Sequence, residues 1–103
     1  MNQTERDNKM QEIIQYKIDI PKNMNEVFDY FDKELTDDDK EQLKQYSAIS
    51  FHHTLGRWIR NNFELWNTQS ELKAWLINKS FTHPDDMSNY IIEEYQKHLK
   101  NEN

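Results

Sequence analysis

Residues 23–43, NMNEVFDYFDKELTDDDKEQL, decide the fold class. Within them, apolar side chains recur at the i, i+3, i+4, i+7 spacing of one helical face; these side chains are Met24, Val27, Phe28, Phe31 and Leu35. Asn23 precedes this stripe as an N-cap, and Thr36 stands as a second N-cap before three aspartates that meet the positive end of a helix dipole. The segment predicts two consecutive helices, with Leu43 and Tyr46 on the inner face of the second.

A third helix follows, and it contains the one glycine of the chain. Ser47 or Ser50 opens this helix, and its apolar period continues through Gly56. A glycine inside a helix costs about 1 kcal/mol relative to alanine. We therefore expect another element to approach its bare backbone closely, with Trp66 or Trp75 as the bulky neighbour. The expected inward side chains are Phe51, Leu55, Trp58, Ile59 and Asn62.

Two further helices complete the predicted bundle. Phe63 to Thr68 reads as a turn that carries apolar anchors, and Ser70 caps a short fourth helix. Thr82 or His83 caps the last helix, in which Pro84 occupies the first position, where no amide hydrogen is needed. The inward side chains of these two helices are predicted to be Leu72, Trp75, Leu76, Met87, Tyr90, Ile91, Tyr95 and Leu99.

The 103 residues form one domain with an N-terminal extension. Residues 1–9 are polar and without periodicity, which predicts a disordered tail. Residues 10–20 form an arm, which is either extended, by the alternation of isoleucine and tyrosine with polar residues, or a short helix. Residues 21–100 are the single helical domain. The predicted fold is a mainly α bundle of four to five helices preceded by this arm.

Composition excludes several classes of function. The chain has no cysteine, one glycine and a net charge of −6, which argues against disulfides, zinc-thiolate sites, glycine-rich phosphate loops and direct nucleic-acid binding. The adjacent histidines, His52 and His53, point about 100° apart on a helix, so we expect no metal or other cofactor. No apolar run is long enough to span a membrane and the N-terminus is polar, so a cytoplasmic location is expected.

The densest group of chemically distinctive residues is 52–66, which holds two of the three arginines. Arg57 and Arg60 are three residues apart, and together they could present guanidinium donors to a carboxylate or phosphate, with catalysis as an extension. The residues of this alternative ligand site are His52, Arg57, Arg60, Asn61 and Trp66. The competing interpretation, which we favour, is that the arginines pair with aspartates at the helix starts, including Asp85 and Asp86.

The strings LGRWIRNN at 55–62, LW at 65–66 and HPDDMS at 83–88 resemble a small uncharacterised bacterial domain family, a domain of unknown function. The opening IPKNM at 20–24 resembles the start of that family. The resemblance extends over residues 20–99 and implies a compact, mainly helical domain without an established activity. The sequence departs from the family pattern at His53 and Thr54, and Phe63 stands where the family has a tryptophan.

The acidic charge is concentrated in residues 24–41, where eight acidic side chains and two lysines account for the whole net charge of −6. Capping and solvation explain such a cluster in structural terms. In functional terms, it suits a protein partner with a basic surface; the residues of this predicted partner-binding face are Glu26, Asp29, Asp37, Asp38 and Glu41. Small acidic helical proteins of bacteria and phages are often immunity proteins, antitoxins or anti-defence inhibitors. The sequence therefore favours a non-catalytic binding module, with a homodimer through the arm as a further alternative.

Overall fold

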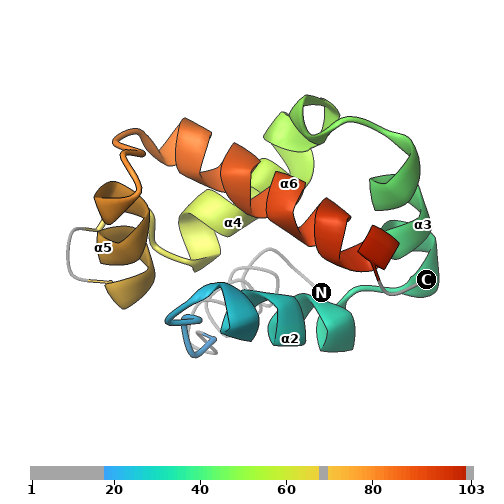
Figure 1. The fold of residues 1–103 in the computed structure, drawn as a ribbon, viewed down its shortest axis with the longest axis horizontal. Helices are drawn as coiled ribbons and strands as arrows, with labels where there is room; N and C mark the ends of the chain where they lie inside the picture. Colours follow the sequence, from blue (N-terminus) through green and yellow to red (C-terminus); the bar gives the residue numbers. More distant parts are fainter. Residues whose placement is uncertain (1–17, 68–69, 102–103) are drawn as a thin grey trace, which may run out of the picture.

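The longest helix, α6 (Pro84–Asn101), crosses the middle of the molecule, and other helices lie on either side of it (Figure 1). The computed structural model describes residues 18–67 and 70–101. The elements before α6 are α2 (Met24–Glu34), α3 (Asp37–Gln45), the 3₁₀-helix η1 (Ala48–Phe51), the π-helix η2 (His52–Gly56), α4 (Arg57–Asn62) and α5 (Glu71–Asn78). All regular structure within the described ranges is helical, which confirms the predicted mainly α fold of four to five helices.

The N-terminal predictions fall largely outside these ranges. The tail, residues 1–9, and the arm up to residue 17 are not described. Ile18 and Ile20, at the end of the predicted arm, are partly buried and pack against the core. Pro21 is buried, and α2 begins three residues after it.

The predicted N-caps of α2 and α3 are confirmed. The Asn23 side chain accepts a hydrogen bond from the Glu26 amide at 2.9 Å. Thr36 and Asp39 form a reciprocal capping box, with distances of 3.0 and 3.2 Å between side chain and amide. The prediction for Tyr46 is wrong, because α3 ends at Gln45. Tyr46 then adopts an extended backbone, the helical period no longer applies, and 58% of the residue is exposed.

The predicted third helix is a succession of three helical geometries. It begins at Ala48, directly after Ser47, and passes through η1 and η2 before α4. The π-turn of η2 ends at Gly56, which is buried. A Cβ at Gly56 would lie 3.0 Å from Arg60 Nη1, 3.2 Å from the Phe51 carbonyl oxygen and 3.7 Å from Ser88 Oγ. The glycine therefore makes room for an arginine, and the prediction of a tryptophan neighbour is wrong.

Aromatic rings contact one another inside the core. Phe31 of α2 has its ring centroid 5.2 Å from that of Tyr95 on α6 and 5.7 Å from that of Phe63. Phe63 and Leu65 are fully buried, which confirms the turn after α4 as a source of apolar anchors. The buried apolar residues are Val27, Phe31, Leu43, Ala48, Ile59, Phe63, Leu65, Leu72, Leu76, Met87, Ile91, Ile92, Tyr95 and Leu99.

Candidate functional site

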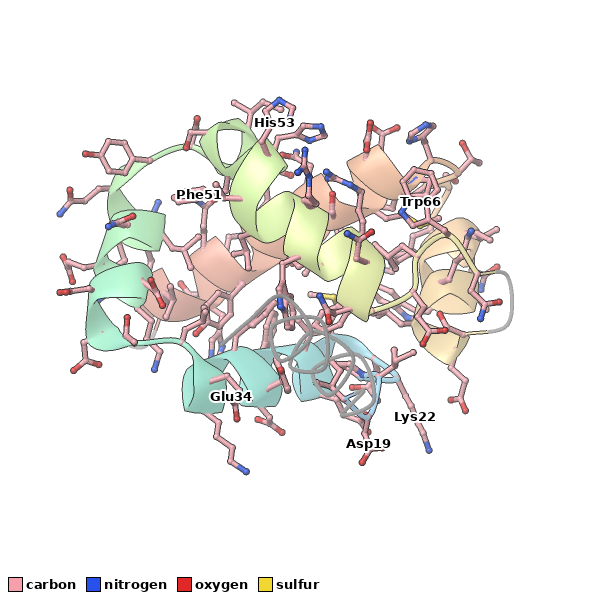
Figure 2. The ribbon with its side chains drawn as sticks, turned by 180° about the vertical axis from the view of Figure 1, so that it is seen from behind. Asp19, Lys22, Glu34, Phe51, His53 and Trp66 are labelled. Atoms are coloured by element: carbon pink, nitrogen blue, oxygen red, sulfur yellow. The ribbon has the colours of Figure 1, made fainter. Side chains whose placement is uncertain are left out.

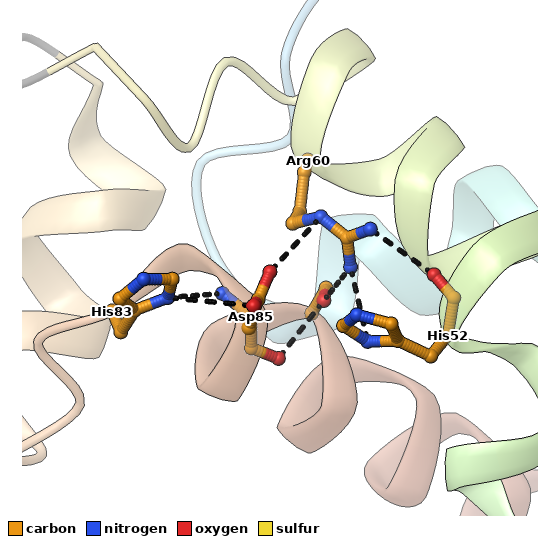
Figure 3. Close-up of polar contacts among 5 residues, drawn as sticks. His52, Arg60, His83 and Asp85 are labelled. Atoms are coloured by element: carbon orange, nitrogen blue, oxygen red, sulfur yellow. Dashed lines mark hydrogen bonds and ion pairs between the residues drawn. The ribbon is translucent and has the colours of Figure 1, made fainter.

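Arg60 is the centre of a polar cluster between α4 and the start of α6 (Figure 3). Only 8% of its side chain is exposed. Its Nη1 donates to Ser88 Oγ at 2.9 Å and lies 3.5 Å from His52 Nδ1, and its Nη2 donates to the His52 carbonyl at 3.1 Å. Its Nε lies 3.4 Å from Asp85 Oδ1. Every nitrogen of the guanidinium group therefore has a partner within the protein. The predicted pairing is confirmed for Arg60 with Asp85, whereas among the described residues neither Arg57 nor Asp86 forms an ion pair.

The partners of Arg60 also organise the first turn of α6. Ser88 Oγ donates to the Asp85 carbonyl at 3.1 Å. His83 caps the helix, because its Nδ1 accepts a hydrogen bond from the Asp85 amide at 3.0 Å, as predicted. Asp85 is partly exposed, so its carboxylate keeps contact with solvent while it faces the guanidinium. The cluster thus joins η2 and α4 to the N-terminus of α6, so its role is to stabilise the fold.

The remaining residues of the alternative ligand site do not join this cluster. Arg57 and Asn61 are exposed, whereas Arg60 is buried, so the two arginines do not form a common donor surface. Trp66 is 59% exposed, and its ring centroid lies 6.1 Å from that of His83. A ligand that used the Arg60 guanidinium would have to displace contacts that hold α4 to α6.

A second polar cluster was not predicted from the sequence. Asp32, at the last turn of α2, accepts a hydrogen bond from Tyr95 Oη at 2.9 Å, and its other carboxylate oxygen lies 2.9 Å from His98 Nε2. Burial acts to raise the pKa of the Asp32 carboxyl, but hydrogen bonds from His98 and Tyr95 and the charges of His98 and Lys40 outweigh it, so this pKa lies below its usual value. These partners are more than 60 residues apart in the sequence, so no local pattern indicates the cluster.

The start and end of α3 are both tied down. Lys40 Nζ donates to the Asp32 carbonyl at 2.8 Å. At the other end, Gln96 Nε2 of α6 donates to the Leu43 carbonyl at 3.0 Å and to the Tyr46 carbonyl at 2.7 Å, which satisfies two acceptors that a helix end leaves without partners. Hydrogen bonds to the rest of the fold therefore hold α3 in place, while its outer side is exposed.

The five carboxylates of the predicted partner-binding face are all exposed. Glu26 and Asp29 lie on α2, whereas Asp37, Asp38 and Glu41 lie on α3. Glu26 accepts a hydrogen bond from the Lys22 amide at 2.9 Å, and Glu41 lies 3.8 Å from Lys44 Nζ. The carboxylates are therefore divided between two helices.

A groove adjoins this face. Two pockets, with cavity volumes of about 490 and about 300 Å³, share Leu35, Leu55 and Trp58 in their walls and so form one groove between α2–α3 and η1–α4. The groove is lined by Tyr30, Phe31, Glu34, Leu35, Asp39, Gln42, Leu43, Ser50, Phe51, Thr54, Leu55 and Trp58. Figure 2 shows Phe51 pointing between α3 and the segment that leads into α4, while His53 points away. Nothing in the sequence marked this groove, because its walls come from separate helices.

Comparison with known proteins identifies the family of the chain. A family model described as "Domain of unknown function (DUF6794)" matches residues 20–99. The chain belongs to the DUF6794 family. The DUF6794 match covers the same residues as the resemblance seen in the sequence and includes every described helix except the last two residues of α6. No curated protein and no solved structure matched the chain.

Within residues 18–67 and 70–101, no three histidine, cysteine or acidic side chains are grouped so that they could hold a metal ion. In the same ranges, no helix has both the length and the apolar character needed to cross a membrane.

Proposed function

We propose that this DUF6794 domain is a non-catalytic protein-binding module that uses the acidic surface of α2 and α3 to engage a basic protein. The proposed class is an immunity, antitoxin or anti-defence inhibitor protein acting in the cytoplasm of a bacterium or in a phage-infected cell. The absence of cysteine agrees with a reducing compartment.

The observation that carries this proposal is the contrast between two groups of charged residues. Arg60, a buried charged residue with donors suited to a ligand, already binds partners within the protein. The carboxylates of Asp37, Asp38 and Glu41 instead face solvent on a helix whose two ends are fixed to the rest of the fold. A fixed array of like charges attracts an oppositely charged partner and raises its rate of association.

The experiment measures, at two salt concentrations, the affinity of the domain for the protein encoded by the gene next to its own. Asp37→Lys with Asp38→Lys should weaken binding strongly and reduce its dependence on salt, because charge attraction is screened over about 10 Å at 0.1 M salt. Asp86→Lys with Glu93→Lys is the matched control, since it makes the same change of charge at exposed positions of α6. Equal affinities for the two double variants would contradict the proposal.

The alternative function, a small-ligand or phosphate pocket around Arg57, Arg60 and Trp66, gives a different result. It predicts saturable binding of inorganic phosphate that disappears with Arg57→Ala in a folded protein. Our proposal predicts that Arg57→Ala leaves partner binding unchanged.

A further inference from the structure

The groove between α2–α3 and η1–α4 leaves apolar side chains open to solvent. Leu35, Phe51, Leu55 and Trp58 each pack against the buried core, yet each is only partly buried. Together they form the walls and floor of a groove of about 490 and about 300 Å³ in its two parts. This volume lies in the range of sites that hold ligands or anchoring side chains, about 300–1,000 Å³.

The charged side chains that line the groove have one sign. The charged residues that line it are Glu34 and Asp39, both exposed and both acidic. Asp39 belongs to α3, the helix that carries most of the proposed binding face. Of the lysines on α3, Lys40 directs its Nζ to the Asp32 carbonyl at 2.8 Å, and Lys44 lies 3.8 Å from Glu41. An occupant must therefore combine apolar side chains with positive charge.

The surroundings of the groove also restrict the backbone conformation of an occupant. The groove lies between helices, and the described residues offer no strand edge that could pair with an extended peptide. An extended segment would bring unpaired amide and carbonyl groups against apolar walls, which costs free energy. A helix satisfies its own backbone groups and presents apolar side chains at i, i+3, i+4 and i+7.

We propose that the groove is the anchoring site for a basic amphipathic helix of the partner protein. The apolar face of that helix enters between Leu35, Phe51 and Trp58, and its lysines and arginines meet the carboxylates of α3. This inference rests on the proposed function, and it adds a site and a ligand class to it: a partner helix held by apolar burial as well as by charge.

The test uses the full chain and a synthetic helical peptide of about five turns, with leucine at i, i+3, i+4 and i+7 and with lysine and alanine elsewhere. A second peptide carries glutamate in place of lysine. Fluorescence anisotropy of the labelled peptides gives the dissociation constants. Gln42→Arg places bulk and positive charge in the groove at an exposed position of α3, and Gln45→Arg makes the same change on the same helix outside the groove.

The inference predicts saturable binding of the lysine peptide, no binding of the glutamate peptide, and a loss of affinity of about tenfold or more with Gln42→Arg. Gln45→Arg should change the affinity by less than about twofold, and circular dichroism should show both variants folded. If the lysine peptide does not bind, or if both variants bind it equally, the groove is not its site.

The Asp37→Lys, Asp38→Lys double variant and the Gln42→Arg single variant together separate this inference from the proposed function. If Asp37→Lys with Asp38→Lys abolishes binding to the neighbouring gene's product but Gln42→Arg does not, the acidic face is the binding site and the groove is not part of it. If neither variant affects binding, both the proposed function and this inference are wrong.

Other occupants of the groove give their own results, and each would overturn the inference. A free protein that sediments as a dimer, and as a monomer after Gln42→Arg, would assign the groove to a second copy of the chain. A peptide affinity that rises about tenfold or more with Ile13→Asp and Ile14→Asp would assign it to the N-terminal residues of the same chain.

Discussion

Replacement of Arg60 by methionine is expected to lower the free energy of unfolding by about 2–4 kcal/mol. The change removes a charged donor from a buried acceptor, Ser88 Oγ at 2.9 Å, and from a partly buried one, the His52 carbonyl at 3.1 Å. Hydrogen bonds to charged groups contribute about 1.5–3 kcal/mol each. Relief of the cost of burying the guanidinium offsets part of this loss. Asp85 is 46% exposed, so water can solvate its carboxylate when the arginine is absent.

The assay is urea unfolding followed by circular dichroism and tryptophan fluorescence, with the slope of the transition compared between variants. Arg57→Met is the matched control, because it makes the same chemical change in the same helix at an exposed position, where substitutions usually alter stability by less than about 0.5 kcal/mol. If Arg60→Met is as stable as Arg57→Met, the polar cluster does not hold α4 to α6, and the structural interpretation of Arg60 is refuted.

Variants at Gly56, Asp32 and Gln96 test other contacts of the fold. Gly56→Ala should lower the stability of the wild type, because the new Cβ would lie 3.0 Å from Arg60 Nη1. In the Arg60→Met background the same substitution should cost at least about 1 kcal/mol less of the free energy of unfolding, which a double-mutant cycle measures. The lowered pKa of Asp32 means that its carboxylate stabilises the fold above the ordinary aspartate pKa of about 3.9, and that this contribution is lost as the pH falls through the folded-state value. The difference in unfolding free energy between the wild type and Asp32→Asn should therefore shrink between pH 7 and pH 3, and a constant difference would contradict this account. Gln96→Leu should leave the Leu43 and Tyr46 carbonyls without their donor and lower stability by about 1–3 kcal/mol. It should also speed amide hydrogen exchange in α3, so unchanged exchange would contradict the role of this glutamine.

Local sequence patterns predicted the features that depend on neighbouring residues. The caps at Asn23, Thr36, Ser70 and His83 are confirmed because a helix start is defined within three or four residues of chain. The apolar stripes were also largely right, because burial repeats with the helical period. The error at Tyr46 arose from extending that period one residue beyond the end of α3.

The features that the sequence did not predict depend on contacts between distant segments. Gly56 was correctly expected to have a close neighbour. That neighbour is Arg60, because the π-turn that ends at Gly56 places the glycine next to the guanidinium group. The Asp32 cluster joins the ends of α2 and α6, and the groove needs walls from several helices. Neither arrangement has a local signature, so both required the folded structure.

The central claim is that recognition occurs on α2, α3 and the adjoining groove, while the arginine cluster is structural. Amide hydrogen exchange of the full chain, measured with and without the lysine peptide, tests it most directly. The account predicts slower exchange in α3 and in residues 50–58, with exchange at the start of α6 unchanged. Protection centred on the turn at Trp66 and on residues 83–88, with α3 unaffected, would contradict it.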